Sequence, residues 1–479
     1  MALRLLKANL GVYEPTAELR EFALRQPLAE KTAPILAASP RILGVSVAIW
    51  NHRATAELLE ALHGAWRSGA ARRPFIILGG PEAAGINARS SLMDYADWIV
   101  QGEGEDCFRD LCAVLLPLAP GTRTEGIQER IVALPSVQGV EGKRITARAV
   151  RLSTLQRAYG LYTDTDLSRK LTYVEASRGC PWGCAFCQSA LSTGVRTFPL
   201  DQVCEAVREL LDRGARSFKF LDRSFNSDIP RAIAIMEVFL RRLENAPVEP
   251  GKEPPFFVHF EMLPGRFPPQ LRECLTRFPA GTLRVEIGIQ TFNGETAARI
   301  NRQSAPKREL KALAFLRDKT HAMVHADLIA GLPGEDLTSF AQGFDRLWGV
   351  RPKEIQLGIL KCLPGTPLAQ NHAAYGIRFN PDPPYEVWET EALSRRDMDR
   401  IKNFARFWER IVNREAVKEL LPRLVPEGKR VFTAFMALSD WLWERFQRSW
   451  AIDRSDLDTA LKEWLQREQE ASGGNGYFG

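Results

Sequence analysis

Three cysteines stand close together in the middle of the sequence, where Cys180, Cys184 and Cys187 share one segment with the spacing C-x3-C-x2-C. A glycine precedes each of the first two and frees the chain to turn tightly, while Phe186 precedes the last. Three thiolates on one loop can hold three irons of a 4Fe-4S cluster and leave the fourth iron open to another ligand. A zinc knuckle is the main alternative, but zinc usually takes a fourth protein ligand, and no second paired motif is evident. We therefore interpret this segment as an iron–sulfur loop.

Acidic and amide side chains stand where predicted strands end, downstream of the cysteines. They are Asp222, Glu261, Gln290 and Asp327, and Arg302 lies twelve residues beyond Gln290. In parallel barrels the reacting groups gather at the carboxyl ends of strands. Each residue also has an ordinary structural interpretation, since Arg302 could lie on a solvated helix face and Asp327 could cap a loop. We favour a shared binding site because these residue types recur at successive strand ends.

The cysteine loop resembles that of the radical S-adenosylmethionine (SAM) enzymes. The resemblance implies that Cys180, Cys184 and Cys187 are the catalytic residues, because they bind a 4Fe-4S cluster whose open iron chelates the amino and carboxylate groups of SAM. An electron from the cluster would cleave SAM to a 5′-deoxyadenosyl radical, which abstracts hydrogen from a substrate.

The strand-end residues resemble the SAM contacts of the radical SAM branch that includes the anaerobic coproporphyrinogen oxidases. The residues that this resemblance and their positions assign to SAM binding are Phe186, Asp222, Glu261, Glu286, Gln290, Arg302 and Asp327. Two of these residues also have another possible role. Asp222 could face the substrate, and Glu286 could be a buried carboxylate paired with Arg284 or Arg302.

Residues 171–370 are expected to form the catalytic barrel, because strands and helices alternate throughout this stretch. The predicted strands are 171–177, 217–221, 256–262, 283–290, 324–332 and 355–360. Six strand–helix units match the partial (β/α)6 barrel of the radical SAM superfamily.

Residues 1–135 are predicted to form a doubly wound, Rossmann-like sheet. The apolar runs at 42–49, 74–78 and 98–100 are typical of parallel strands buried on both faces. They alternate with helical periods at 54–67 and 107–116. Glycine-rich turns follow the second and third strands, at the edge where such sheets bind ligands.

These turns, ahead of a radical SAM loop, resemble the cobalamin-binding domain of cobalamin-dependent radical SAM enzymes. The cobalamin contacts implied by this resemblance are Ser46, Gly79, Gly80, Gly102 and Glu103. The motif D-x-H-x-x-G is absent, so the resemblance implies that no histidine binds the cobalt. Taken alone, the two adjacent glycines are equally compatible with a tight turn that binds nothing.

The first residues depart from that pattern. Residues 1–10 resemble the first helix of such a domain and residues 17–24 its second strand, which would leave the central first strand missing. Either residues 2–9 supply the strand, or the chain begins late and the domain is destabilised.

Two further segments complete an α/β chain of three parts. Residues 136–170 are predicted to be a linker, because they are rich in basic residues and lack a strong period. Residues 371–479 are predicted to form a helical domain, with amphipathic stretches at 397–412 and 431–447. This region resembles a C-terminal domain of unassigned function found in one branch of these enzymes.

The overall charge favours no particular partner. The 479 residues include 64 basic and 58 acidic side chains, a net charge of +6, which does not favour nucleic acid. We see no signal peptide and no apolar run long enough to span a membrane, so a cytoplasmic location is expected. The other cysteines, which we expect to be core thiols in a reducing compartment, are Cys107, Cys112, Cys204, Cys274 and Cys362.

The function favoured by these resemblances is that of a cobalamin-dependent radical SAM methyltransferase. One SAM would methylate cobalamin and a second would generate the radical, so that a methyl group passes via methylcobalamin to an unactivated carbon or phosphorus atom. We expect a small-molecule or peptide substrate, a reductant such as flavodoxin or ferredoxin, and neither membrane nor nucleic acid as a partner.

Three alternatives remain open. They are a cobalamin-dependent cyclase or rearrangement enzyme, a cobalamin-free radical SAM enzyme that modifies RNA or inserts sulfur, and a non-catalytic cobalamin or redox sensor. Sulfur insertion needs a second cluster, and the other cysteines show no grouping for one.

Overall fold

The computed structural model describes residues 1–69, 71–87, 89–118, 124–191, 194–245, 252–415, 419–424 and 430–473. The chain divides into two compact units. The amino-terminal unit comprises residues 1–170, 197–214 and 382–384, and the barrel unit comprises residues 171–196, 215–381 and 385–479. Across the described residues, no helix has both the length and the apolar character needed to cross a membrane.

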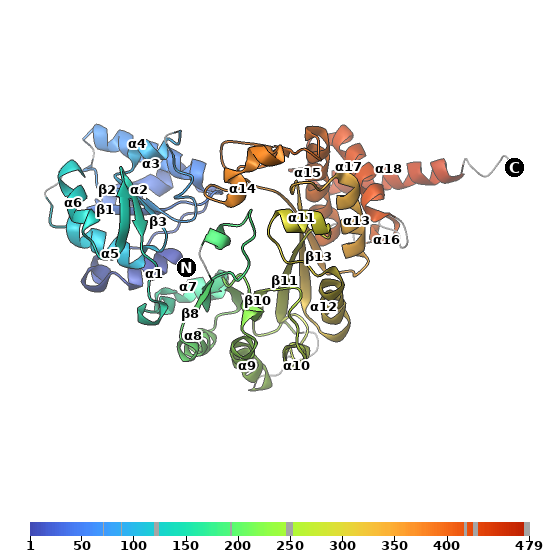
Figure 1. Cartoon of the computed structure of the whole chain (residues 1–479), viewed down its shortest axis with the longest axis horizontal. Coiled ribbons are helices and arrows are strands. Elements are labelled where there is room, and N and C mark those ends of the chain that lie inside the picture. Colours follow the sequence, from blue (N-terminus) through green and yellow to red (C-terminus); the bar gives the residue numbers. More distant parts are fainter. Residues whose placement is uncertain are drawn as a thin grey trace. The chain divides into compact units, whose positions relative to one another are not determined.

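The amino-terminal unit is built on a five-stranded sheet with the order β1-β2-β3-β5-β4 (Figure 1). Its strands are β1 (Ile42–Ser46), β2 (Phe75–Gly79), β3 (Trp98–Gln101), β4 (Val137–Glu141) and β5 (Arg144–Ala147). Neighbouring strands run parallel, except that β4 is antiparallel to β5. Its helices are α1 (Ala2–Ala8), α2 (Leu28–Ala38), α3 (His52–Arg67), α4 (Leu92–Tyr95), α5 (Gly104–Leu115), α6 (Gln128–Val132), α7 (Asp164–Arg169) and α8 (Leu200–Asp212).

Strand β2 shows why the predicted doubly wound arrangement is correct. Ile76 and Leu78 pack on one face of the sheet in a cluster with Leu59 of α3. Ile77, between them, points to the other face and packs in a cluster with Leu111 of α5. Because successive strand residues face opposite sides, a continuous apolar run needs helices on both.

The segment 136–170 is not a plain linker, and this expectation is corrected. It forms the hairpin β4–β5, in which Glu141 pairs with Arg144 across a turn that contains Gly142 at φ 56°. Strand β5 then adds to the sheet beside β3, with Ile99 in register with Arg144. The hairpin buries Val137 and Ile145, which gives its alternating pattern a core to face.

The first residues also differ from one expectation. Residues 2–9 do not supply a strand, since α1 occupies them, and residues 17–24 form no strand. A side chain of α1 holds the start of this second segment instead. The ammonium group of Lys7 donates to the carbonyl oxygens of Glu14 and Ala17, at 2.8 and 2.6 Å.

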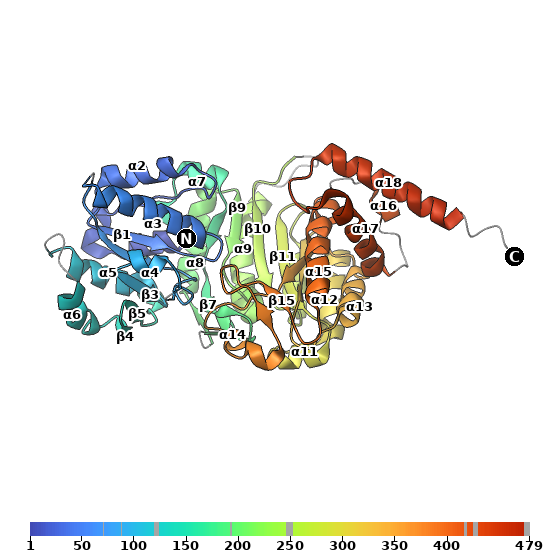
Figure 2. The ribbon, with the colours of Figure 1, turned by 90° about the horizontal axis from the view of Figure 1, so that it is seen from above.

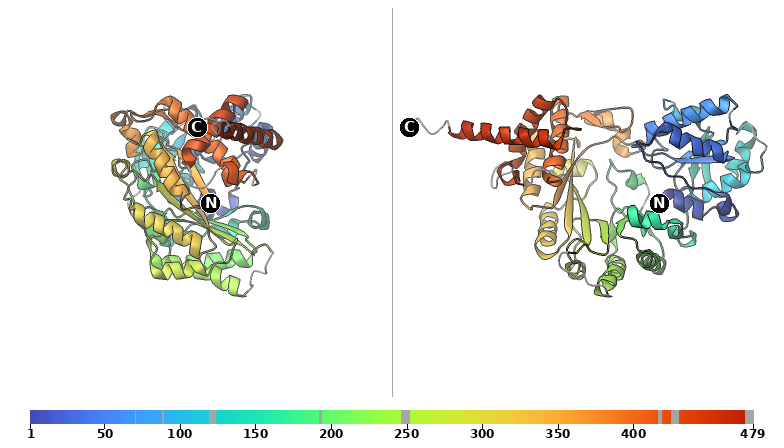
Figure 3. Two further views of the ribbon diagram at one scale, coloured as in Figure 1. Left: turned by 90° about the vertical axis from the view of Figure 1, so that its right-hand side faces the viewer. Right: turned by 180° about the vertical axis from the view of Figure 1, so that it is seen from behind.

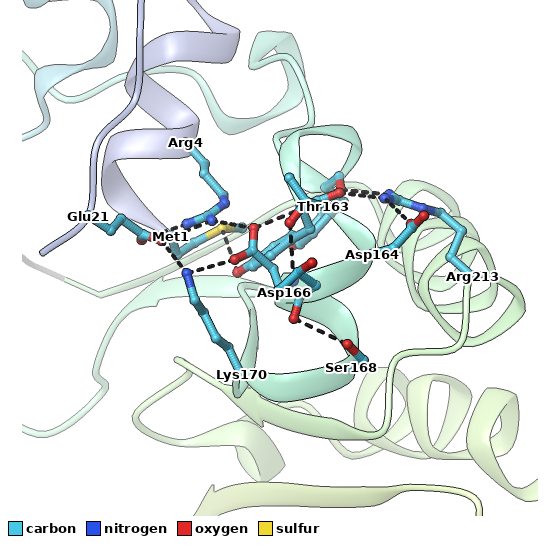
Figure 4. A network of polar contacts seen from close by, with 12 residues as sticks. Met1, Arg4, Glu21, Thr163, Asp164, Asp166, Ser168, Lys170 and Arg213 are labelled. Atoms are coloured by element: carbon cyan, nitrogen blue, oxygen red, sulfur yellow. Dashed lines mark hydrogen bonds and ion pairs between the residues drawn. The ribbon is translucent and has the colours of Figure 1, made fainter. Parts of the chain in front are cut away.

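An ionic network ties this segment to α1 and α7, with Arg4 and Asp166 buried and Glu21 and Lys170 exposed (Figure 4). Arg4 donates to Glu21 at 2.8 Å and to Asp166 at 2.9 Å, and Lys170 lies 2.7 Å from Asp166. Thr163 and Asp166 form a capping box at the start of α7. Burial opposes ionisation of Asp166, but hydrogen bonds from Lys170, Thr163 and Arg4 outweigh it and lower the pKa of Asp166.

The barrel unit is built on six parallel strands with the order β13-β12-β11-β10-β9-β6, which confirms the six predicted strand–helix units (Figure 2). They are β6 (Thr172–Val174), β9 (Ser217–Phe220), β10 (Phe257–Met262), β11 (Leu283–Gln290), β12 (Met323–Ala330) and β13 (Glu354–Ile359). The helices between them are α9 (Ile229–Asn245), α10 (Pro269–Thr276), α11 (Gly294–Arg299), α12 (Pro306–Lys319) and α13 (Leu337–Trp348). Short pieces complete the unit: β7 (Ser177–Gly179), β8 (Val195–Thr197), α14 (Pro367–Gln370), β14 (Arg378–Phe379) and β15 (Val387–Glu389).

The two faces of the barrel sheet have opposite chemistry. Residues such as Phe260, Val285 and Val324 are buried on the face that the helices line (Figure 1). The alternate residues on the other face, which we call the inner face, are half-buried and mostly polar or charged, as the pattern of β11 shows. This polar face positions the candidate site.

From residue 395 to residue 473 the described chain is mainly helical, as predicted for this region (Figure 3). The helical segments are α15 (Arg395–Trp408), a π-helical turn (Glu409–Asn413), α16 (Leu421–Leu424), α17 (Val431–Phe446) and α18 (Arg454–Gly473). Helix α17 packs against α15 and α13. Phe344 of α13, Phe404 and Trp408 of α15 and Phe432 and Phe435 of α17 form one aromatic cluster, so these helices share a core with the barrel.

Candidate active site

The cysteine loop leaves β7 and is held by backbone hydrogen bonds from distant segments of the barrel unit. The amide of Ala185 donates to the carbonyl oxygen of Ile300 at 2.9 Å, and the amide of Leu368 donates to that of Ala185 at 2.9 Å. The side chain of Asn301 donates to the carbonyl oxygen of Gly183 at 2.9 Å. A Cβ on Gly183 would lie 3.0 Å from that amide nitrogen, so glycine allows the close contact.

The three cysteines are free thiols with different exposure. Cys184 is buried, whereas Cys180 and Cys187 are half-buried. Burial raises the pKa of Cys180 and of Cys184, and the charge of Arg302 opposes the shift at both. Metal binding would have to displace these protons.

No group of three or more His, Cys, Asp or Glu side chains gathers around one metal-ion position in the described part of the chain. A cluster places a different demand on its ligands, because each cysteine binds a different iron atom. Three separate free thiols on one loop therefore fit a cluster better than a mononuclear metal. Phe186 is a half-buried residue of the same loop.

Arg302, which follows α11, contacts the cysteine loop. Its Nη1 lies 3.8 Å from Sγ of Cys184, and its guanidinium carbon lies 4.4 Å from the centre of the Trp182 ring. Its Nη2 donates to the carbonyl oxygen of Gly288 in β11. The solvated-helix interpretation of Arg302 is wrong, because only 8% of the residue is exposed.

Gln290 ends β11 in a strained conformation. Its φ is 70°, in a region that few residues other than glycine adopt, and the pairing of β11 with β12 shifts between Gly288 and Gln290. Its Oε1 is buried and has no hydrogen-bond partner among the described residues. An orphaned acceptor in a strained backbone marks a position where a polar ligand could bind.

Glu261 and Glu286 lie in register on adjacent strands and share a lysine. Lys219 Nζ lies 3.7 Å from Glu261 Oε1 and 3.3 Å from Glu286 Oε2. Arg223 lies 3.3 Å from Glu261, and His259 Nε2 lies 2.9 Å from Glu286. Burial opposes ionisation of Glu286, but contact with His259 and the nearby positive charges outweigh it and lower the pKa of Glu286 to about 2. Burial raises the pKa of Glu261, against the opposing charge of Arg223.

Asp327 lies one strand further along the inner face. Its Oδ1 is 3.1 Å from Nε2 of His325, and it is in register with Gly288. Burial raises the pKa of Asp327, and His325 opposes this.

Asp222 contacts the chain that precedes the cysteine loop. Its oxygens accept hydrogen bonds from the amide of Ala176, at 2.9 Å, and from the hydroxyl of Ser177. The side chain is buried, and burial raises the pKa of Asp222 to about 6. Asp222 therefore fixes the chain that leads into the cysteine loop.

The structure places several residues here that were not predicted: Trp182 on the loop, and Lys219, Arg223, His259 and His325 around the strands. A signal was present for two of them. His259 precedes Glu261 by two residues and His325 precedes Asp327 by two, so strand alternation puts each pair on one face.

The predicted cobalamin residues lie in the amino-terminal unit, and the backbone itself explains two of the glycines. Gly80 has φ 99°, and a Cβ there would lie 2.6 Å from the carbonyl oxygen of Val47. Gly102 has φ 95°, and its Cβ would lie 3.0 Å from the carbonyl oxygen of Ala147. Neither glycine therefore argues for a ligand by itself.

The other candidates at this edge differ among themselves. A Cβ on Gly79 would make only an ordinary contact, 3.7 Å from an oxygen atom. Ser46 is half-buried at the end of β1, and its hydroxyl lies 3.0 Å from the position of a Cβ on Gly80. Glu103 accepts a hydrogen bond from the amide of Val150 at 2.7 Å, which fixes its side chain.

Two neighbouring residues at this edge were not predicted. Trp50, between β1 and α3, is 71% exposed. His52 lies 3.4 Å from the buried carboxylate of Glu82 through Nδ1, and 3.0 Å from the hydroxyl of Ser90 through Nε2. Both ring nitrogens of this histidine therefore have a protein contact.

Two families match parts of the chain. Residues 174–347, which include the cysteine loop and the strand-end residues, match the radical SAM superfamily. Residues 373–474 match a protein family of unknown function, DUF4080.

The chain is also similar to individual proteins. It is 25% identical, over 390 residues, to a 2-(S-pantetheinyl)-carbapenam-3-carboxylate methyltransferase from Streptantibioticus cattleyicolor, a match that covers 74% of this chain and 54% of the relative. The chain thus spans about half the length of the curated relatives it matches.

Two solved structures share the fold at low sequence identity. The cobalamin-dependent SAM radical enzyme OxsB is 15% identical with a TM-score of 0.62, over 99% of this chain and 78% of that one. The radical SAM methyltransferase TsrM from Kitasatospora setae, solved with cobalamin and a 4Fe-4S cluster bound, is 16% identical with a TM-score of 0.59, over 79% of this chain and 74% of that one.

Proposed function

We propose that this chain, a radical SAM protein with a C-terminal DUF4080 domain, is a cobalamin-dependent enzyme that transfers a methyl group to an unactivated carbon or phosphorus atom. The observation that carries the proposal is the set of three free cysteines on one loop, with Arg302 against the buried Cys184. Methyltransferase relatives and the fold shared with cobalamin-binding enzymes support the finer assignment.

The cysteine loop would hold a 4Fe-4S cluster, and the inner-face residues would hold SAM. When bound, the cluster and SAM supply a carbon radical, and cobalamin supplies the methyl group. Glu261 and Asp327 offer carboxylates for a ribose diol or a sulfonium, and Gln290 offers an unpaired acceptor. Arg302 places a positive charge beside Cys184, which would stabilise the thiolate that binds iron.

The cobalamin assignment rests on the exposed edge of the amino-terminal sheet. The open carboxyl edge of a doubly wound sheet is where ligands bind, and the exposed indole of Trp50 offers an apolar surface there for a macrocycle. His52 is held by Glu82 and Ser90, so we expect no histidine nitrogen on the cobalt.

The direct test is the ultraviolet–visible spectrum and iron content of protein purified without oxygen and supplied with cobalamin. We expect both cluster and corrin absorption, with about four irons per chain. Replacing Cys180, Cys184 and Cys187 by Ala should abolish the iron. Cys274→Ala is the matched control, because this buried cysteine belongs to the same unit but lies in α10. Full iron in the triple variant would overturn the cluster assignment.

Product analysis separates the remaining candidates. Methyl transfer should release S-adenosylhomocysteine together with 5′-deoxyadenosine, whereas a cyclase or rearrangement enzyme should release only 5′-deoxyadenosine. Sulfur insertion would require a second cluster, yet the other five cysteines are all buried and dispersed through the described chain. A sensor would bind the cofactors without turnover. We also propose a reductant of flavodoxin or ferredoxin type as the electron source.

A further inference from the structure

His325 lies between two carboxylates on the inner face of the barrel sheet. Its Nε2 is 3.1 Å from Asp327 Oδ1, and its Nδ1 is 3.2 Å from Glu354 Oε2. The His325 side chain is only 12% exposed, and both carboxylates are more than three-quarters buried. Each ring nitrogen therefore lies within ion-pair distance of a carboxylate, although neither contact has hydrogen-bond geometry. A protonated imidazole, which carries positive charge at both N–H groups, suits a position between two carboxylates.

Strand register and Arg284 fix the position of Glu354, the second carboxylate beside His325. His325 of β12 is in register with Glu354 of β13 and with Glu286 of β11. Arg284 Nη2 lies 2.8 Å from Glu354 Oε1, so the carboxylate of Glu354 is held between an arginine and the histidine. His325 thus has a fixed support on one side and Asp327 on the other.

The carboxylates of the inner face outnumber the side chains that are always positively charged. Lys219, Arg223 and Arg284 meet four carboxylates, Glu261, Glu286, Asp327 and Glu354. Protonated His325 supplies a further positive charge beside Asp327 and Glu354, and His259 is a second histidine in the network, 2.9 Å from Glu286. Burial opposes protonation, but contacts with Asp327 and Glu354 outweigh it and raise the pKa of His325 to about 10. A neutral side chain at this position would leave the buried Asp327 facing Glu286 with one fewer positive charge nearby.

We propose that His325 is a positioning residue that holds the Asp327 carboxylate ionised and oriented for SAM. The proposal rests on the assignment of SAM to this site. His325 acts through Asp327 and does not itself contact the ligand. Asp327 lies two residues closer to the carboxyl end of β12 than His325 does, on the same face of the sheet. His325 therefore supports Asp327 from the side nearer the amino end of the strand.

The test is the SAM dissociation constant of cluster-loaded protein at pH 7.5, measured by calorimetry. His325→Leu should weaken SAM binding about thirtyfold, and His325→Gln, which keeps one donor, about fivefold. A tenfold loss of affinity corresponds to about 1.4 kcal/mol. His321→Gln is the matched control. This exposed histidine precedes the same strand and should bind SAM as the wild type does.

A double-mutant cycle separates positioning from general damage to the fold. In an Asp327→Asn background, His325→Leu should cause no further loss of affinity, because the group it supports is gone. An additive loss would overturn the proposal, as would wild-type affinity in both single His325 variants. A nitrogen-15 histidine spectrum of the wild-type protein is a second readout that needs no variant to fold. It should show the His325 ring protonated at pH 7.5, and a neutral ring would contradict the proposal.

The two proposals fail in different ways. If wild-type, cluster-loaded protein does not bind SAM at all, the proposed function fails and this inference fails with it. If the wild type binds SAM and the His325 variants bind it equally well, only the positioning role is overturned.

Discussion

The carboxyl edges of the two sheets differ in the kind of residue that forms each candidate site. At the barrel edge, side chains with chemistry are held by partners on neighbouring strands, as Glu286 is by His259 and Lys219. At the amino-terminal edge the candidates include glycines, and Gly80 and Gly102 are required by their own backbone contacts. At the barrel edge, charged groups and hydrogen-bond acceptors are the evidence for a ligand site. At the amino-terminal edge, the evidence is mainly the shape of the backbone turns. A glycine pattern is weaker evidence for a ligand than a set of supported charged residues.

The largest effect is expected for Gly80→Ala at the amino-terminal edge. The added Cβ would meet the carbonyl oxygen of Val47 at 2.6 Å at a positive φ, which should destabilise the amino-terminal unit by about 3 kcal/mol. Chemical denaturation without cobalamin measures this. Gly126→Ala is the control, since its Cβ would meet nothing within 4 Å. A fully stable Gly80→Ala variant would show that the backbone contact does not require glycine here, and a bound ligand would again be a reason for this glycine.

The Asp166 network should make the amino-terminal unit sensitive to acid. The folded-state pKa of Asp166 is lowered below its ordinary value of 3.8, so its ion pairs stabilise the fold above that pH and are lost as the pH falls. Because the side chain is only 8% exposed, removing this partner of Arg4 should cost on the order of 3 kcal/mol. Unfolding curves from pH 7 to pH 3 should therefore be flatter for Asp166→Asn than for the wild type. Parallel curves would show that the network contributes nothing to acid stability.

Asp222 tests whether the cysteine loop depends on support from β9. Asp222→Ala would leave the Ala176 amide and the Ser177 hydroxyl without their acceptor, at a cost of about 1–3 kcal/mol. We expect the variant to retain less iron after gel filtration, while Asp222→Asn, which keeps one acceptor oxygen, should retain more. Equal iron in wild type and both variants would mean that the loop holds its shape without Asp222.

The smallest effect is expected for Gly79→Ala, which isolates the ligand question at the amino-terminal edge. Its Cβ would make an ordinary 3.7 Å contact, so stability should change by less than about 1 kcal/mol. If a corrin lies against this turn, cobalamin affinity should fall about tenfold, or about 1.4 kcal/mol. Unchanged affinity would remove Gly79 from the cobalamin site.

Much of the fold could be predicted from local patterns. The apolar run that contains Ile76, Ile77 and Leu78 requires helices on both faces, and the structure has them. The β4–β5 hairpin was missed although its alternation and the turn glycine Gly142 were signals, because the basic residues around it suggested a linker.

The site was predictable where chemistry followed strand position, and not where it depended on contacts between distant segments. Alternation could place Glu261, Gln290 and Asp327 on the polar face of the sheet. Glu261 and Gln290 lie at or next to the ends of β10 and β11, as predicted, whereas Asp327 lies within β12 and not at its end. The contact of Arg302 with Cys184 joins residues 118 positions apart, and no local pattern reports it. The turn of Asp222 toward Ser177 likewise depends on how β9 meets the chain before the cysteine loop.

Binding of SAM to an open iron of the cluster can be observed in the electron paramagnetic resonance spectrum of the reduced, cluster-loaded protein, recorded with and without SAM. If three cysteines leave one iron open to SAM, adding SAM should change the g-values of the cluster signal. The same addition should leave the spectrum of an Asp327→Ala, Gln290→Ala variant unchanged at a SAM concentration that saturates the wild type. A cluster with about four irons per chain whose spectrum does not respond to SAM in the wild type would contradict the account.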